Sequence, residues 1–238
     1  MKTIAAIPTI NKLEWTAPLA EHLLQADQLD EVWIYDNGST DNTRIWTEHR
    51  LKLDTRLKYI DASSMRLYDM WNDMILKASK LDNEVNLAIL NNDIRLPHNS
   101  IYIMSNLMRK EKYKLVAIDP GRPAIFTKTI NIYAGEGTVP NPIDPYIEKM
   151  GPKNRIGWAF VVAAEWWKNE PFAIHPDYII WYGDNDLYLR THKRGGKIGW
   201  VRGVGCDHAM EQSDSEYPKK WDHAEIDKQT FRKIWPKG

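Results

Sequence analysis

Apolar residues along the first half of the chain form short runs, separated by longer amphipathic segments. The apolar runs predict buried strands at 3–7, 31–36, 57–62, 85–90 and 114–119. Between two of these runs, Leu67, Trp71, Met74 and Ile75 recur at helical spacing. Strands that alternate with helices indicate βαβ units, and hence an α/β fold with a largely parallel sheet.

The second half of the chain has a less regular pattern. Residues 120–152 contain Gly, Pro and scattered apolar residues without a period, which is typical of a long binding loop. Regularity returns at 157–167 and continues with a predicted helix near 184–194 and a predicted strand at 197–201. The residues after these mix charges of both signs, and we expect them to wrap the surface.

Composition narrows the classes of function. The 238 residues are 43% apolar and 27% charged, as in soluble globular proteins. The 32 basic and 32 acidic side chains give no net charge that would attract nucleic acid or an anionic membrane. The longest apolar stretch, 159–164, is far shorter than the about 20 residues that span a bilayer. The N-terminus lacks the features of a signal peptide, and the single Cys206 allows no internal disulfide, so we expect a cytoplasmic protein.

Polar side chains follow three of the predicted strands where each strand ends. The residues at these strand ends are Pro8, Thr9, Asp36, Asn37, Asn91, Asn92 and Asp93, all of them polar except Pro8. Taken one at a time, they are explained equally well by turn or helix-cap chemistry. The carboxyl ends of parallel strands meet at one edge of a sheet, however, and ligands bind there. Their coincidence therefore favours a shared site, whose carboxylate and amide oxygens suit Mg²⁺ or Mn²⁺.

Two later segments contain further candidate groups. Asp184 and Asp186 begin the predicted helix, where carboxylates either favour the helix dipole or act as a general base in a cleft. His208 follows a Gly-rich turn and is either structural or a ligand, but no second Cys or His has zinc-site spacing. The motifs G-x-x-x-x-G-K-S/T, G-x-G-x-x-G after the first strand and G-x-S-x-G are absent from the sequence.

In their order, these segments resemble the motifs of GT-A glycosyltransferases, especially the family-2-like group that includes bacterial rhamnosyltransferase-type enzymes. IPTINK is similar to the opening I-P-T/S-x-N segment, VWIYDNGSTDNT to V-V-D-N-G-S-T-D, and LNNDIRLP to the L-N-N-D-x-x-x-P form of the DXD metal motif. GWAFVVAAEWW, WYGDNDLYLRTHKRGGKIGWV and DHAMEQS resemble the acceptor-side segment, the segment of the catalytic base and the late His element. The resemblance covers residues 3–99 and 156–213.

The resemblance implies a single GT-A domain over 1–238, with a Rossmann-like, mainly parallel sheet flanked by helices. Residues 1–99 would be the nucleotide-binding half and 100–238 the acceptor-side half. Nucleotide binding would fall to Pro8, Thr9, Asn11, Asp36, Asn37, Asn72, Asn91 and Asn92. The metal ligands would be Asp93 and His208, and the catalytic groups Asp184 as base and Asp186 in support. Two positions depart from the family: Gly183 replaces a Glu and Trp71 replaces an Arg.

The implied reaction is a metal-assisted, inverting transfer of a sugar from a nucleoside-diphosphate sugar to an acceptor hydroxyl. Asn37 favours UDP- or dTDP-sugars, and the acceptor would be a glycan, a lipid-linked glycan or another hydroxyl compound. A nucleic acid acceptor is not favoured, because phosphate contacts need clustered Lys and Arg. Two alternatives remain: a nucleotidyltransferase, which should have a Gly-rich loop after its first strand, and a degraded nucleotide-sugar-binding module.

Overall fold

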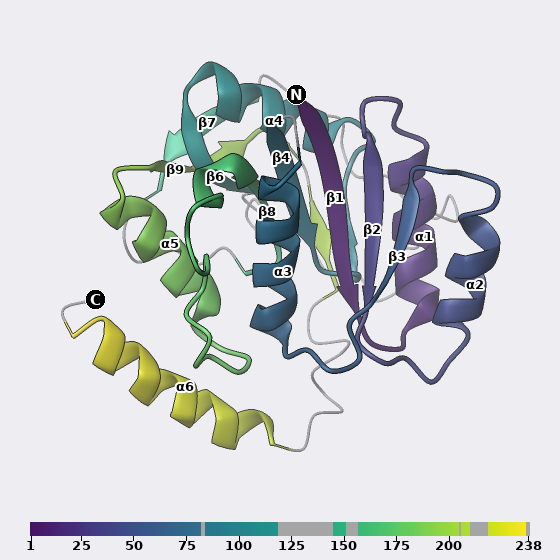
Figure 1. The fold of residues 1–238 in the computed structure, drawn as a ribbon. Helices are drawn as coiled ribbons and strands as arrows, with labels where there is room; N and C mark the ends of the chain where they lie inside the picture. Colours follow the sequence, from purple (N-terminus) through teal and green to yellow (C-terminus); the bar gives the residue numbers. More distant parts are fainter. Residues whose placement is uncertain (82–83, 119–144, 151–156, 205, 210–218, 237–238) are drawn as a thin grey trace.

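A computed structural model of the chain describes residues 1–81, 84–118, 145–150, 157–204, 206–209 and 219–236 (Figure 1). The first half alternates strands and helices, as the hydrophobic pattern predicts. Its elements are β1 (Lys2–Thr9), α1 (Leu13–Leu24), β2 (Glu31–Asp36), α2 (Thr43–Arg50), β3 (Leu57–Asp61), α3 (Leu67–Ser79) and β4 (Val85–Leu90). Most of the irregular segment predicted at 120–152 lies outside the described residues.

The second half adds further strands and the remaining helices. Its elements are β5 (Ile94–Arg95), α4 (Ser100–Lys110), β6 (Tyr113–Ile118), β7 (Tyr146–Lys149), β8 (Ala159–Ala163), the 3₁₀ helix η2 (Ala164–Trp167), α5 (Gly183–Lys193), β9 (Lys197–Arg202), β10 (Asp207–His208) and α6 (Lys220–Ile234). The sequence did not predict α6: the C-terminal residues form a regular helix where only a charged surface segment was expected.

Eight of these strands form one sheet in the order β3-β2-β1-β4-β8-β6-β9-β7. The neighbours β3, β2, β1 and β4 are parallel to one another, and so are β6 and β9. β8 is antiparallel to β4 and β6, and β7 is antiparallel to β9. The sheet is thus mostly parallel, as predicted, and takes strands from both 1–99 and 100–238.

Alternate residues of the central strands face opposite sides of the sheet, and both sides are covered. In β1, Ile4 and Ala6 lie in the core formed with α3 and α5, whereas Ala5 and Ile7 lie in the core formed with α1 and α4. All four side chains are fully buried. Burial on both faces explains why this strand is an unbroken apolar run rather than an alternating one. The result is a sheet between two helical layers (Figure 1).

Within the described part of the chain, no helix combines the length and the apolar character that a membrane crossing requires.

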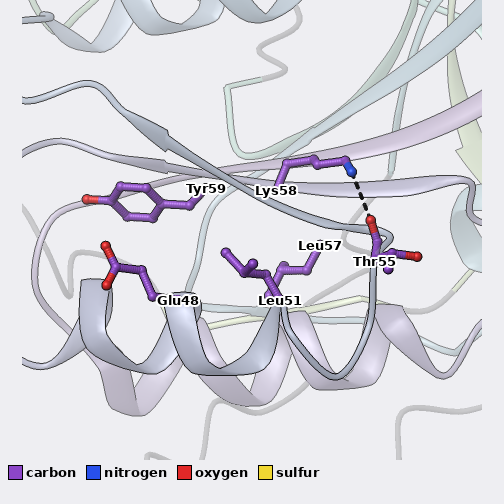
Figure 2. A pocket seen from close by; sticks show the side chains of 6 residues that line it. All are labelled: Glu48, Leu51, Thr55, Leu57, Lys58 and Tyr59. Atoms are coloured by element: carbon purple, nitrogen blue, oxygen red, sulfur yellow. Dashed lines mark hydrogen bonds between the residues drawn. The ribbon is translucent and has the colours of Figure 1, made fainter.

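A hollow at the outer edge of the sheet lies between α2 and β3 (Figure 2). Its lining residues are Glu48, Leu51, Thr55, Leu57, Lys58 and Tyr59. Lys58 Nζ donates to the carbonyl oxygen of Thr55 at 2.9 Å, across one end of the hollow. Only Tyr59 connects it to the strand ends, since its hydroxyl donates to Asp36 Oδ2 at 3.0 Å. The hollow is therefore not the site that the sequence motifs indicate.

A histidine pair joins α1 to the loop before α4. His22 Nε2 lies 2.6 Å from the carbonyl oxygen of Leu96, and the His22 ring stacks on His98 with 4.0 Å between ring centroids. Burial, together with the charge that His98 can carry, lowers the pKa of His22 to about 4. The folded protein therefore keeps His22 neutral at pH values where an unfolded chain would protonate it.

This difference predicts that the free energy of unfolding falls as the pH is lowered from 6.5 to about 4. Within that window the unfolded chain binds a proton at His22 and the folded chain does not. We expect a loss on the order of 2 kcal/mol, because each pKa unit corresponds to about 1.4 kcal/mol and partial exposure reduces the effect. Urea unfolding at pH 7 and pH 4.5 measures it. His22→Gln should show a smaller pH dependence, and an unchanged dependence would contradict the prediction.

Candidate active site

The carboxyl ends of β1 and β2 lie side by side at one edge of the sheet. Thr9 pairs with Asp36, and the backbone N–H of Asn37 donates to the Thr9 carbonyl at 2.8 Å. Pro8 lies opposite Tyr35, beyond the last β1–β4 pair, so its missing N–H does not interrupt the pairing with β4. The prediction that these strand ends meet is confirmed.

Asp36 is fixed at the end of β2. Its side chain is 1% exposed and accepts hydrogen bonds from the Ser39 backbone N–H at 2.9 Å and from the Tyr59 hydroxyl at 3.0 Å. Burial and the neighbouring carboxylate raise the pKa of Tyr59 to about 12, so this hydroxyl remains a donor. The position of the Asp36 carboxylate is therefore set by its partners.

Asn11 joins the loop after β1 to the loop after β2. Its backbone is left-handed, with φ 53°, a conformation that Asn tolerates better than most residues. Its backbone N–H donates to Ser39 Oγ at 2.7 Å, and its Oδ1 accepts from the Thr40 backbone N–H at 2.8 Å. In this structure the Asn11 amide thus shapes the strand-end loops.

Asn92, two residues after the end of β4, makes side-chain hydrogen bonds in the protein interior. It is 5% exposed, and its Nδ2 donates to Thr9 Oγ1 at 3.2 Å and to Thr16 Oγ1 at 3.1 Å. The half-buried Asn91 donates its backbone N–H to the Trp158 carbonyl at 2.9 Å. These bonds connect β1, α1 and the residues after β4, and they hold the chain just before Asp93.

Asp93 and His208 come together through a second, two-stranded sheet. β5 pairs antiparallel with β10, so that Ile94 lies opposite His208, and the Ala209 backbone N–H donates to the Asp93 carbonyl at 3.1 Å. His208 Nε2 is 3.1 Å from Asp93 Oδ1, and the two side chains are 14% and 5% exposed. The two residues named as metal ligands are thus neighbours.

In this structure the Asp93 oxygen and the His208 nitrogen contact each other directly, and both are atom types that divalent cations accept as ligands. Among the described residues, no cluster of three or more His, Cys, Asp or Glu could hold a metal ion. A cation bound by Asp93 and His208 would therefore need additional oxygen ligands, which a bound diphosphate or water can supply.

Trp158 connects this pair to Asp184. Its ring stacks on His208, with centroids 5.3 Å apart and planes inclined by 19°. The adjacent Gly157 approaches Asp184 so closely that a Cβ on residue 157 would lie 2.8 Å from Asp184 Oδ2. Only glycine fits there without moving the carboxylate. Asp184 thus lies against Gly157, the residue next to Trp158, and Trp158 stacks on the His208 ring that contacts Asp93.

Gly183 has no room for a side chain, because a Cβ there would overlap the ring of Tyr68. The Tyr68 hydroxyl donates to the Ile180 carbonyl at 2.9 Å and holds the ring in that place. The Glu that the resemblance expects at this position is sterically excluded here. Because α5 begins with Gly183 and not with a Glu, its first carboxylate is that of Asp184.

Asp186 is 0% exposed, and both of its oxygens are engaged. Oδ2 accepts from the His175 backbone N–H at 2.7 Å and from Arg190 Nε at 2.6 Å, while Oδ1 accepts from Trp235 Nε1 at 2.6 Å. These bonds connect α5 to two other segments, one at His175 and one at Trp235 after α6. The arrangement is compatible with a supporting role and leaves no open oxygen for a substrate.

Helix α3 holds the segment that precedes α5. Asn72 Oδ1 accepts from the backbone N–H groups of Ala173 and Ile174 at 2.8 and 2.9 Å, and Asn72 Nδ2 donates to the Ile174 carbonyl at 2.7 Å. Trp71 is 2% exposed and packs edge-on against Phe160 at 5.0 Å. The position that carries Arg in similar proteins is therefore part of the core.

The motifs gave no indication of Asp227 in α6. It is 0% exposed and accepts hydrogen bonds from the backbone N–H groups of residues 179, 180 and 181, each at 2.8 Å. A weak signal was present, because Asp227, Phe231 and Trp235 recur every four residues within a charged segment.

The family model described as glycosyl transferase family 2 matches residues 4–176. The chain belongs to this family. The match includes the strand-end motifs and the Gly157–Trp158 segment but stops before Asp184 and His208. None of the curated protein sequences matches the chain. Membership in the rhamnosyltransferase-type subgroup stays a prediction.

Solved structures with this fold are similar in shape but distant in sequence. The mannosyltransferase PcManGT from Pyrobaculum calidifontis, in complex with GDP-Man and Mn²⁺, has a TM-score of 0.67 and 15% identity over 100% of this chain and 65% of its own. Glucosyl-3-phosphoglycerate synthase from Mycobacterium tuberculosis, with Mn²⁺, UDP and phosphoglyceric acid, has a TM-score of 0.61 and 12% identity over 99% and 78%. S. aureus TarS 1–349 has a TM-score of 0.58 and 14% identity over 84% and 58%.

The glycosyltransferase fold predicted from the sequence is thereby confirmed. The chain spans 58% of the TarS structure and 65% of PcManGT, less than two thirds of each.

Proposed function

We propose that this protein transfers a sugar from a nucleoside-diphosphate sugar to an acceptor hydroxyl with inversion. The observation that carries the proposal is the placement of two candidate groups beside the consecutive residues Gly157 and Trp158: Asp184 lies against Gly157, and His208, which contacts Asp93, stacks on Trp158. A divalent cation, Mn²⁺ or Mg²⁺, held by Asp93 and His208 would offset the negative charge that develops on the departing nucleoside diphosphate. The similar folds with GDP-Man or UDP and Mn²⁺ support this class of donor.

Asp184 would take the proton from the acceptor hydroxyl as general base. It lies in the first turn of α5, and the Asn185 backbone N–H donates to its Oδ1 at 2.9 Å, which helps to orient the carboxylate. A retaining double displacement would need a second carboxylate as nucleophile. Asp186 is buried with both oxygens engaged, so α5 offers no such group and inversion is the outcome we infer.

The nucleotide would bind in residues 1–99 and the acceptor in 100–238. We assign base recognition to Asn37 and to the end of β2 at Asp36, whose carboxylate is bonded to Ser39 and Tyr59 and would act by shaping the pocket. Donors with UDP or dTDP are favoured. The side chains of Thr9, Asn11, Asn72 and Asn92 are bonded to other parts of the protein, so they would act by shaping the pocket. Pro8 and Asn91 would border the nucleotide at the strand ends.

The acceptor would be a glycan, a lipid-linked glycan or another hydroxyl compound, and the enzyme would work in the cytoplasm. A nucleotidyltransferase is the less favoured alternative, because the residues after β1 read NKLEW and contain no Gly-rich loop. A degraded binding module is also less favoured, because Asp184 and His208 both occupy the site.

A thermal-shift screen should identify the donor. The panel is UDP-glucose, UDP-GlcNAc, dTDP-rhamnose and GDP-mannose, each with Mn²⁺, Mg²⁺ or EDTA. Binding at a hundred times Kd stabilises the fold by about 2.7 kcal/mol, so the preferred nucleotide sugar should raise Tm clearly and only with a metal. Slow release of the nucleoside diphosphate from the same donor would separate an enzyme from a binding module. If no nucleotide sugar raises Tm with either metal, the proposed function is wrong.

A further inference from the structure

Helix α6 is attached by one face to the segment that carries Asp184. Asp227 and Phe231 are four positions apart and so lie above one another on this face, and Trp235 follows as the residue that ends the helix. Asp227 accepts from the backbone N–H groups of residues 179–181, the Phe231 ring packs on Tyr182 at 5.1 Å, and Trp235 donates to Asp186. The three side chains thus contact successive parts of 179–186.

The carboxylate of Asp227 makes the most specific of these contacts. It is the only fully buried side chain among the described residues of α6. A buried carboxylate is destabilising unless hydrogen bonds compensate for the lost water. Here three successive N–H groups, each at 2.8 Å, supply that compensation. The three N–H groups can donate to the same carboxylate only when residues 179–181 adopt this backbone conformation. Asp227 therefore stabilises this conformation over others.

That conformation sets the start of α5. Tyr182, which precedes the helix, has a left-handed φ of 65°. This costs a residue other than glycine about 1 kcal/mol, so the surrounding contacts must hold it. Asp184 follows two residues later, and its carboxylate lies against Gly157, the residue before Trp158. An altered turn at 179–182 would therefore move this carboxylate.

The place of α6 in the fold supports a role other than core formation. In Figure 1, α6 lies beneath α5, at the end of the molecule where β1 and β2 have their carboxyl ends, and apart from the sheet. Its other faces are exposed or half-buried. The hydrogen bonds of Asp227 go to the segment around Asp184, and Phe231 and Ile234 also pack against the edge of the core.

We infer that Asp227 is a positioning residue for sugar transfer. Through the backbone of residues 179–181 it holds the start of α5, and with it the Asp184 carboxylate, in the geometry that proton removal requires. The inference rests on the proposed role of Asp184 as base. Phe231 and Trp235 extend the same attachment along α5.

Hydrogen exchange tests the attachment without any substrate. Asp227→Asn keeps the size of the side chain but replaces an acceptor oxygen with an NH₂ donor, so at least one N–H of residues 179–181 loses its partner. Amide exchange in peptides covering 179–186 should accelerate tenfold or more, while peptides of β1 and β4 remain unchanged. Asp222→Asn, an exposed carboxylate at the start of the same helix, is the matched control. Unchanged exchange in 179–186, or equal acceleration everywhere, would overturn the inference.

Kinetics test the consequence. With UDP-glucose or GDP-mannose, whichever raises Tm more, Asp227→Asn should lower kcat at least tenfold and leave the donor KM within twofold. In an Asp184→Asn background, Asp227→Asn should have no further effect, because it acts through Asp184. An equal loss in both backgrounds, or no loss in the wild type, would refute the positioning role.

A failure of the proposed function would give a different result. Asp184→Asn would then keep near-normal turnover, both with Asp227 and with Asp227→Asn. If Asp227→Asn does not fold, Trp235→Phe removes the hydrogen bond to Asp186 and keeps an aromatic ring. The same exchange and kinetic comparisons then apply, with the same outcomes for and against.

Discussion

Replacing Asp184 with asparagine should reduce sugar transfer by about 10²- to 10⁴-fold, the range that general-base catalysis contributes. Asparagine has nearly the same shape and can still accept the hydrogen bond from the Asn185 backbone N–H. It cannot take a proton from an acceptor hydroxyl. Loss of kcat with unchanged donor binding would therefore separate the proton transfer from the positioning of the nucleotide sugar.

The measurement is release of the nucleoside diphosphate in the presence of an acceptor, together with the Tm shift that the donor produces with Mn²⁺. Asp177→Asn makes the same chemical change at a carboxylate of the preceding segment that is 65% exposed, and it should leave both quantities unchanged. Near-normal turnover by Asp184→Asn would remove this residue from the base role.

Replacing Asp93 with asparagine should weaken Mn²⁺-dependent donor binding by about 100-fold or more. Metal coordination contributes several kcal/mol to charge stabilisation, and each 1.4 kcal/mol corresponds to a factor of ten. Among the described residues, the carboxylate of Asp93 contacts His208, and it is 5% exposed. The rate of sugar transfer should fall together with the affinity for the donor, because the leaving diphosphate loses the positive charge of the cation.

Titration of UDP with Mn²⁺ and in EDTA distinguishes this effect from simple misfolding. Binding in EDTA should be the same for the wild type and for Asp93→Asn, and only the gain on adding Mn²⁺ should disappear. His208→Gln should lose part of the same gain. Wild-type transfer that is unaffected by EDTA, together with normal donor binding by Asp93→Asn, would show that the metal assignment is wrong.

Much of the fold follows from hydrophobic periodicity. The stretches 4–7, 32–35 and 87–90 within the apolar runs have no charged or amide side chain on either face, which indicates a sheet covered on both sides. Strands of this kind that alternate with helices are parallel, and the observed pairing of β2, β1 and β4 agrees. Polar residues directly after such strands consequently meet at one edge.

Strand direction in the second half could not be predicted in the same way. β8 is as apolar as β4, but it runs antiparallel between β4 and β6. A strand that is buried on both faces has the same apolar pattern whether it runs parallel or antiparallel to its neighbours. The pattern therefore does not predict strand direction. Likewise β5 and β10 contain two residues each, too few for any period to appear.

Some residues of the candidate site could be predicted from the sequence, and others could not. The sequence by itself determined the strand-end residues Asp36, Asn92 and Asp93, because they depend on local order along the chain. Only the tertiary structure decided that His208 contacts Asp93, since a two-residue strand pairing joins positions far apart in the chain. It alone excluded a side chain at Gly183, which the ring of Tyr68 overlaps.

The same holds for Asp227. In the sequence it is one acid among many charges of both signs, whereas in the fold it is a buried acceptor of three backbone N–H groups. Periodicity reports which face of an element is buried, and it contains no information about which distant atoms complete a hydrogen bond.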